Sequence, residues 1–422
     1  MNNTTPTTPS PAKLQRHLAL WHIIIIGLAY IQPMTVFDTF GLVSEASNQH
    51  VPTSYIIALI AILLTSLSYG SMIRRYPSAG SAYTYAQKSI HPNVGFMVGW
   101  SSWLDYLLSP LVNIILAVIY LEALFPEVNK WIWVVILTGF MTWINVHGSK
   151  VVAYFNSWIV FVQLLIIGVF TWLVYTKLST GLNADGSINP AAYQLWSLQP
   201  FWNDIANMTA LISGATILCF SFTGFDSLSS LAEETKDVQK TLPKAIFLTA
   251  LIAGVVFIIS TYFMQIYFPH TPDKYFSDVA ATQPDILMLV GGSAFQAAVL
   301  GFAIITVMAS GISAHAGVSR LMYVMGRDGV INKRIFGHIH PKYLTPTYNI
   351  YIAGVIALTA GFINFDVIAH LISFGALTAF SFVNLSVIAT YIVREKRYHT
   401  AKDVFLYLIV PLLGFISVAL MW

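Results

Sequence analysis

The amino-acid sequence predicts an all-α, polytopic membrane protein of about 11 spans, built from two inverted halves. Three observations predict this fold class. The 422 residues are 56% hydrophobic and only 9% charged, whereas a soluble domain is about 25% charged. Long apolar stretches follow one another along the chain, and a short acidic motif occurs in two of them. These stretches are continuous, and therefore do not fit barrel strands, which alternate in hydrophobicity over about ten residues.

The spans follow from the length that a bilayer requires, about 20 apolar residues per helix. Residues 1–17 precede them. They are polar and rich in Pro and Thr, and we expect a disordered cytoplasmic segment rather than a signal peptide. The predicted spans are 18–46, 52–73, 94–124, 131–147, 152–176, 206–232, 244–268, 285–316, 348–364, 367–392 and 404–422. The first and eighth are long enough to be tilted or broken.

Positive charge is distributed unevenly between the connecting segments. If the N-terminus lies in the cytoplasm, all but three of the 21 Lys and Arg residues fall in segments predicted to be cytoplasmic. The three exceptions are Lys130, Lys177 and Lys274. Because cytoplasmic segments carry an excess of Lys and Arg, this distribution supports both the span assignment and a cytoplasmic N-terminus.

Three acids lie well inside predicted spans, where no Lys or Arg is found: Asp38, Asp105 and Asp226. A carboxylate at membrane depth is costly and is usually retained for a function. Its partner would be a proton, a bound metal ion or a cationic substrate. The alternative is that these acids are neutral, or are satisfied locally by the backbone.

The motif T-x-F-D occurs at 35–38 and again at 223–226, each time followed by a hydroxyl residue. Five spans separate the two copies, which predicts inverted halves at 18–176 and 206–392, with 404–422 as an eleventh helix outside them. Pro33 interrupts the first copy's helix because it lacks an N–H. Ser221, Thr223 and Gly224 interrupt the second.

The same motif has a purely structural interpretation. Thr-x-x-Asp resembles a capping box, in which the hydroxyl caps a helix and the acid follows three residues later. A half-helix that begins inside a membrane has free N–H groups to satisfy. Capping and ligand binding can coexist, because a carboxylate has several acceptor sites.

Longer motifs resemble the amino acid–polyamine–organocation transporters. They are R-R-Y-P-S-A-G-S-A-Y-T-Y-A (74–86), G-F-M-V-G-W (95–100), L-A-E-E-T-K-D-V-Q-K-T-L-P-K-A-I (231–246) and S-R-L-M-Y-V-M-G-R-D-G (319–329). Within that family, P-M-T-V-F-D-T-F-G, A-G-S-A-Y-T-Y-A-Q-K-S-I, G-W-S-S-W-L-D-Y and A-T-I-L-C-F-S-F-T-G-F-D are similar to the bacterial putrescine importers.

This resemblance implies the ten-helix core of the leucine-transporter fold, with broken first and sixth helices. It also implies proton-driven import of a small diamine across the bacterial cytoplasmic membrane. The alternatives are transport of another cationic amine or an amino acid, or a transporter-like sensor. The chain departs from the family in two ways. Members usually have twelve helices, and proton-coupled amino acid members often carry a lysine where this chain has Gln163.

The predicted site contains anionic and aromatic groups suited to a diamine. Amino acid members of the family usually hold a carboxylate on a Gly-rich break, but 30–35 here reads Y-I-Q-P-M-T. The predicted substrate-binding residues are Asp38, Asp105, Tyr106, Ser221, Phe225 and Asp226, and the predicted gating or lining residues are Phe37, Phe220 and Gly224. An aromatic ring adds about 0.5–2 kcal/mol of cation–π attraction, although each ring has packing or lipid contact as its alternative role.

No other class of site is predicted. The sequence contains no G-x-x-x-x-G-K-[ST] phosphate-binding loop, so ATP-driven transport by this chain alone is not expected. We expect no catalytic residue, no metal site, no cofactor and no nucleic-acid partner. The expected partners are a small amine, protons and the lipid bilayer, and the sequence leaves the oligomeric state open.

Overall fold

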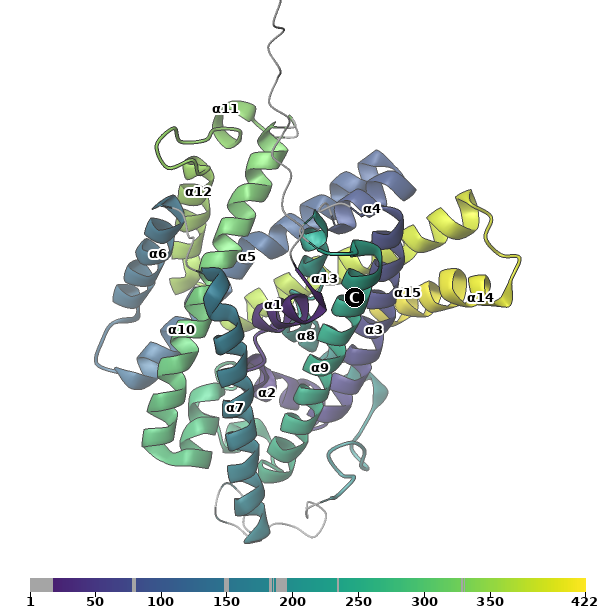
Figure 1. The fold of residues 1–422 in the computed structure, drawn as a ribbon. Coiled ribbons are helices and arrows are strands. Elements are labelled where there is room, and N and C mark those ends of the chain that lie inside the picture. Colours follow the sequence, from purple (N-terminus) through teal and green to yellow (C-terminus); the bar gives the residue numbers. More distant parts are fainter. Residues whose placement is uncertain are drawn as a thin grey trace, which may run out of the picture.

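The computed structural model describes residues 18–77, 81–147, 152–181, 184, 186, 196–233, 235–327, 329 and 331–422. The regular elements in these ranges are helices, packed as a bundle (Figure 1). A single isolated bridge pairs Leu18 with Thr235. The segment 1–17, predicted to be disordered, lies outside the described residues.

The helices follow one another in the predicted order. They are α1 Leu20–Ile31, α2 Thr35–Ala46, α3 Val51–Arg75, α4 Ser81–Ser89, α5 Pro92–Leu124, α6 Lys130–His147, α7 Val152–Ser179, α8 Met208–Phe222, η2 Asp226–Glu233, α9 Val238–Tyr267, η3 Pro272–Lys274, α10 Gln283–Arg327, α11 Lys333–Phe336, α12 Thr347–Ala357, η4 Leu358–Gly361, α13 Phe365–Val387, η5 Ile388–Arg394, α14 Ala401–Val404, η6 Phe405–Ile409 and α15 Val410–Leu420.

Seven helical segments of the described chain are long and apolar enough to cross a membrane, and the bent pair α1 and α2 makes an eighth. The other predicted spans coincide with shorter or less apolar helices. The span at 131–147 corresponds to α6, which has 18 residues. The span at 206–232 contains the 15-residue α8 followed by η2, and that at 348–364 contains α12 and η4. The fold class is therefore that of a multi-pass helical membrane protein.

Both predicted helix breaks are present. The axes of α1 and α2 differ by 51° across Gln32, Pro33 and Met34, and Gln32 adopts a left-handed conformation with φ 51°. In the second half, α8 ends at Phe222 and Gly224 has φ 107° before η2 begins. A Cβ at Gly224 would lie 2.9 Å from Cβ of Tyr30. This break therefore requires glycine for conformation and for close approach.

The capping interpretation of the threonines is wrong in its details. The N-cap of α2 is Met34, and its side chain makes no capping hydrogen bond. The Thr35 hydroxyl instead donates to the carbonyl of Gln32, at 2.9 Å. In the same way the Thr223 hydroxyl donates to the carbonyl of Phe220, at 2.8 Å. Each of these carbonyls also accepts the backbone N–H of the same threonine, at 2.9 Å for Thr35 and 3.1 Å for Thr223, so the hydroxyl adds a second donor at the break.

The two halves pack in the same pattern. α3 packs against α9, and α5 against α10, so equivalent helices of the two halves meet each other. Three further pairs of contacts match when each helix is replaced by its equivalent in the other half, α1 by α8, α3 by α9, α5 by α10 and α7 by α13. The contact of α1 with α9 matches that of α8 with α3. The contact of α1 with α7 matches that of α8 with α13, and the contact of α7 with α10 matches that of α13 with α5. Such a pattern is expected when a pseudo-two-fold axis relates two halves.

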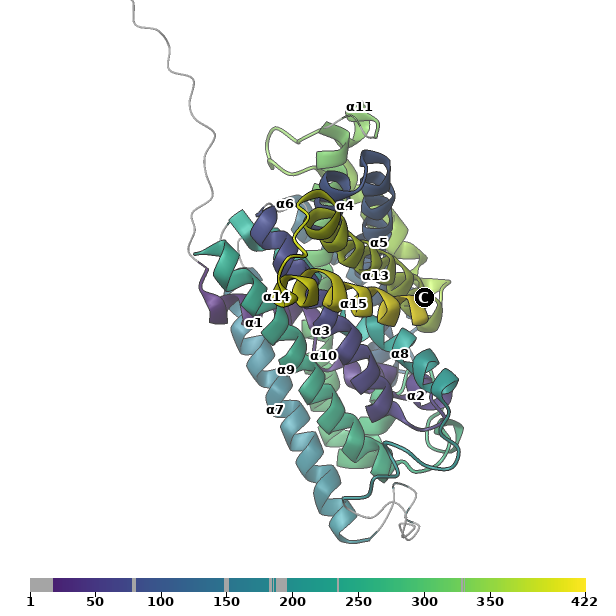
Figure 2. The same cartoon turned by 90° about the vertical axis from the view of Figure 1, so that its right-hand side faces the viewer.

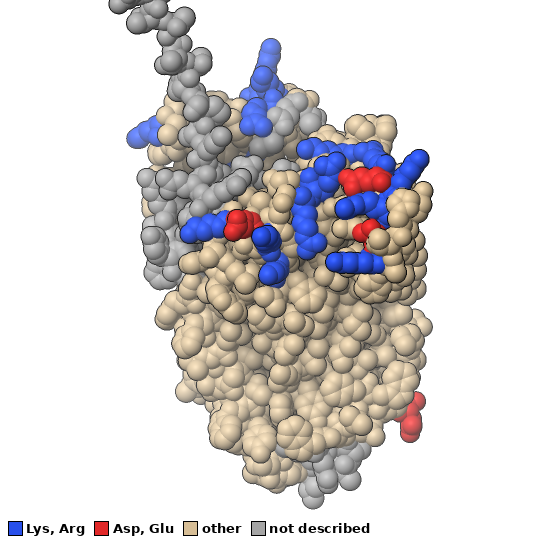
Figure 3. All heavy atoms as spheres, turned by 45° about the vertical axis from the view of Figure 1, so that its right-hand side comes forward, with Lys and Arg blue, Asp and Glu red and all other residues tan. Residues whose placement is uncertain are grey.

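Figures 1 and 2 agree on which helices lie at the outside of the bundle. α7 and α9 run beside each other along one side, and α15 packs across α3 (Figure 2). On the face in Figure 3, Lys and Arg side chains gather at the upper end of the molecule. Four basic residues lie in the last turns of helices: Arg74 and Arg75 of α3, Lys88 of α4 and Arg394 of η5.

Candidate functional site

The break between α8 and η2 faces the middle of α5, and two acids meet at this point. Asp226 begins η2, and Asp105 lies on α5 with 8% of its surface exposed. The two carboxylates are close enough to interact electrostatically. On the residue after Asp105, the Tyr106 hydroxyl lies 3.1 Å from the Ser227 hydroxyl. We call Asp105, Tyr106, Asp226 and Ser227 the acidic pair site.

The two acids of this site have different surroundings. One carboxylate oxygen of Asp226 accepts the N–H of Gly224 at 3.3 Å, and the amides of Asp226 and Ser227 are also directed at this carboxylate. Asp105 is enclosed by α13 instead, because a Cβ at Gly375 would lie only 3.3 Å from Cβ of Asp105. The absence of a side chain at Gly375 therefore leaves room for Asp105.

Aromatic side chains form one wall beside the acidic pair site. Tyr69 of α3 interacts electrostatically with both Asp226 and Tyr106. Its ring lies 5.8 Å from that of Phe225, which lies 5.1 Å from that of Phe380. The predicted lining residue Phe225 is thus a fully buried part of this wall. Among the described residues, no Lys or Arg interacts with either acid.

Asp38 lies in a second, more enclosed cluster. Only 3% of its surface is exposed, and the Tyr120 hydroxyl of α5 donates to its Oδ1 at 2.8 Å. The same hydroxyl lies 3.1 Å from Oε1 of Gln283, the first residue of α10. The preceding Thr282 hydroxyl donates to the carbonyl of Phe37 at 2.7 Å. We call Asp38, Tyr120, Thr282 and Gln283 the latch cluster.

The two clusters lie at different depths. Tyr120 and Asp105 belong to the same continuous helix, and at 1.5 Å per residue they are about 22 Å apart along its axis. An extended four-carbon diamine is roughly 6 Å from nitrogen to nitrogen, given bond lengths of about 1.5 Å. Even a tyrosine side chain that leaned back along the axis by about 6 Å would not close this gap. The structure therefore does not bring Asp38 together with Asp105 and Asp226.

The other predicted residues are distributed between these clusters. Phe37 is buried against Phe170 of α7, with ring centroids 4.7 Å apart. Phe220 packs edge-on against Phe365 of α13 at 5.5 Å. The Ser221 hydroxyl accepts a hydrogen bond from Tyr55 at 3.4 Å. Gly224 and Phe225 adjoin the acidic pair site.

The residues that the sequence analysis missed come mainly from distant elements. Tyr120, Thr282 and Gln283 have no local motif, so only tertiary structure identifies them. Ser227 did have a signal, since it is the hydroxyl that follows the second T-x-F-D. Its counterpart in the first copy, Thr39, lies 3.4 Å from the Tyr55 hydroxyl. In both halves, the hydroxyl after the aspartate contacts a tyrosine.

Gln163, which stands where related transporters often have a lysine, contacts the first helix break. It is completely buried on α7, and its Oε1 accepts the N–H of Met34 at 3.4 Å. Gln32 is held from another side, because its Nε2 donates to Oδ1 of Asn113 at 3.1 Å. Neutral amides thus bond two polar groups of this break, the Met34 N–H and the Gln32 side chain.

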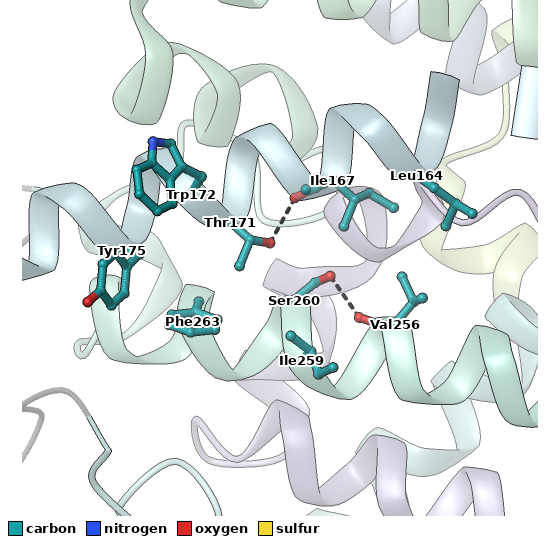
Figure 4. Close-up of a pocket in the computed structure, with 10 residues that line it drawn as sticks. Leu164, Ile167, Thr171, Trp172, Tyr175, Val256, Ile259, Ser260 and Phe263 are labelled. Carbon is teal, nitrogen blue, oxygen red and sulfur yellow. Dashed lines mark hydrogen bonds between the residues drawn. The ribbon is translucent and has the colours of Figure 1, made fainter. Parts of the chain in front are cut away.

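Other places in the described chain do not suit a cation. No group of three or more His, Cys, Asp or Glu side chains there could hold a metal ion. A groove of about 540 Å³ lies between α7 and α9 (Figure 4). Its hydroxyls donate within their own helices, Thr171 to Ile167 at 2.8 Å and Ser260 to Val256 at 2.7 Å. None of its lining residues is charged, so the groove offers an amine no ion pair.

Comparisons with known proteins agree on the class of molecule. The family model described as amino acid permease matches residues 22–422. The low-affinity putrescine importer PlaP of Escherichia coli strain K12 is 55% identical over all of this chain and 91% of its own length. The methylthioribose transporter of Bacillus subtilis strain 168 is 26% identical, over 96% of this chain and 86% of the relative.

A solved structure is similar in fold. A sodium-coupled sialic acid symporter in a substrate-bound, outward-open state matches with a TM-score of 0.57. The match covers 96% of this chain and 89% of the symporter at 14% sequence identity. At that identity the likeness concerns the fold alone, and it agrees with the broken helices described above.

Proposed function

The chain belongs to the amino acid permease family, and on this premise we propose that it imports putrescine by proton symport through alternating access. The family is one of transporters, so no enzymatic reaction is assigned. The observation that carries the proposal is the acidic pair site, in which Asp105 and Asp226 interact beside Tyr106 without a basic partner among the described residues. The similarity to a putrescine importer over the whole chain supports it.

Charge balance favours a diamine over an amino acid. Two neighbouring carboxylates at membrane depth repel each other and lack a fixed cation. A dication such as putrescine neutralises both, whereas a zwitterionic amino acid would place its own carboxylate beside two others. The aromatic wall of Tyr69 and Phe225 suits the apolar methylenes, and the Tyr106 ring can add cation–π attraction. A cationic amino acid meets the same objection through its carboxylate.

The proposal includes a topology. The repeat halves are 18–176 and 206–392, which rock about the two broken helices, and 404–422 lies outside them. We place the chain in the bacterial cytoplasmic membrane with its N-terminus in the cytoplasm. The gathering of Lys and Arg at one end of the molecule supports this orientation, because cytoplasmic segments are enriched in positive charge.

Uptake into proteoliposomes tests the function. Labelled putrescine should accumulate when the outside is more acidic, and a protonophore should abolish the accumulation. Unlabelled putrescine or cadaverine should compete better than ornithine or lysine. If no amine moves under any gradient, the proposal fails. If lysine or ornithine competes better than either diamine, the protein is a cationic amino acid carrier instead.

A further inference from the structure

We propose that Asp38 carries the coupling proton, in the closed latch cluster away from the amine site. The inference rests on the proposed function, since it assigns the symported proton to a residue. It starts from the depth difference: a diamine held at Asp105 and Asp226 does not reach the Asp38 carboxylate, which is bonded to Tyr120, a residue about 22 Å from Asp105 along the axis of α5. Asp38 is therefore a buried acid that the amine site leaves unused.

The surroundings of Asp38 favour a neutral acid. Of the elements packed against α2, α3 contributes Tyr55 and α5 contributes Tyr120, and both act on Asp38. The other neighbouring elements carry titratable side chains as well, namely Cys219 of α8, Tyr267 of α9, Asp273 and Lys274 of η3, and Asp285 of α10. A buried carboxylate without a cation is costly, and protonation removes that cost.

The hydrogen bonds of the latch cluster can serve both protonation states. The Tyr120 hydroxyl has one proton but two acceptors within reach, Oδ1 of Asp38 and Oε1 of Gln283. If Asp38 is protonated, it donates to Tyr120, and Tyr120 donates to Gln283. If Asp38 is ionised, Tyr120 donates to Asp38, and a rotated Gln283 amide donates to Tyr120 through the Nε2 that otherwise has no partner. A proton can therefore bind or leave without a lost hydrogen bond.

The latch cluster also connects the proton to a conformational change. Thr282 and Gln283 precede and begin α10, and they hold α2 through the Phe37 carbonyl and the Tyr120 relay. Phe40, two residues after Asp38 on α2, packs against Phe268 and Phe276, with ring centroids 6.1 and 6.2 Å away. Closing the latch cluster around an ionised Asp38 buries a charge, whereas closing it around the neutral acid does not. Protonation thus favours the closed arrangement, and loss of the proton favours its opening.

The substitution Asp38→Asn tests this assignment, because asparagine has nearly the same shape but cannot carry a proton. Wild-type and variant proteins are compared in proteoliposomes for putrescine binding, for counterflow of labelled putrescine, and for gradient-driven accumulation with a lumenal pH dye. We expect binding within about threefold of wild type and retained counterflow, because the acidic pair site is intact and exchange needs no net proton movement. Accumulation and amine-linked proton uptake should be lost.

Asp105→Asn is the matched control. It should weaken putrescine binding by at least about tenfold, as expected for loss of one charge from a buried pair. The inference is overturned if Asp38→Asn still accumulates putrescine on a proton gradient. It is equally overturned if Asp38→Asn folds normally but loses binding as Asp105→Asn does, which would make Asp38 an amine ligand.

A second variant covers the case in which Asp38→Asn does not fold. Tyr120→Phe keeps the carboxylate but removes the relay hydroxyl, so the pH at half-maximal accumulation should shift by about one unit while putrescine affinity is unchanged. An unchanged pH profile contradicts the assignment. Failure of the proposed function is a separate result, because wild-type protein would then neither bind nor move putrescine.

Discussion

Asp226→Asn measures how much of the amine affinity depends on charge. Asparagine keeps the carbonyl oxygen that accepts the Gly224 N–H, so the break should keep its shape. Removing one partner of a buried charged pair costs about 2–5 kcal/mol. Asp226 is partly exposed, unlike Asp105, so the lower part of that range applies. We expect a loss of about 2–3 kcal/mol, which is roughly 30- to 150-fold in Kd at 1.4 kcal/mol per tenfold.

Binding and stability must be measured on the same purified protein. Labelled putrescine binding gives Kd, and thermal unfolding in the same detergent gives the melting temperature. Asp366→Asn is the matched control, because Asp366 is 44% exposed and paired with His370 on the surface, and it should leave Kd unchanged. A loss below about threefold for Asp226→Asn, with a normal melting temperature, would refute the role of its charge in binding.

Two further substitutions test the helix breaks. Gly224→Ala should lower the free energy of unfolding by at least about 1–2 kcal/mol, because the site has φ 107° and the new Cβ would meet Tyr30. Gly139→Ala is the control, because a Cβ at Gly139 has nothing within 4 Å. In the same thermal unfolding assay, this control should not destabilise the protein. Gln163→Leu should lower the free energy of unfolding by about 1–3 kcal/mol, because it leaves the buried Met34 N–H without its acceptor. An unchanged melting temperature would mean that the break needs no amide from α7.

Local patterns in the sequence were enough to predict both breaks. Pro33 lacks an N–H and Gly224 tolerates positive φ, and these are properties of single residues. Their equivalent positions in two halves predicted the repeat that the exchanged helix contacts display. The direction of the threonine hydroxyl bonds was not predictable in the same way. It depends on which backbone group the break brings within reach of the hydroxyl, and in both copies that group is the carbonyl three residues earlier.

The grouping of the acids required tertiary structure. In the sequence, Asp38 and Asp226 occupy equivalent positions, which suggests equivalent roles. What separates them is the residue that each meets on other helices: Tyr120 and Gln283 for Asp38, but a second acid, Asp105, for Asp226. No spacing along the chain encodes which residues of α5 or α10 face a given break.

Under the two proposals, the difference between the copies would let one motif serve two cations. A proton needs a single carboxylate that can be closed off from water, and Asp38 has one hydroxyl donor and 3% exposure. Under the proposed function a diamine needs two negative charges, which Asp226 and Asp105 would supply, and Asp226 is also partly exposed. If the assignment of the proton to Asp38 is right, each acid should lose its role when its neighbours are changed. In a double variant, Asp105→Asn should weaken putrescine binding at the second break. Tyr120→Asp places a second acid beside Asp38 of α2, and this pair of acids should disrupt proton-driven accumulation rather than restore it.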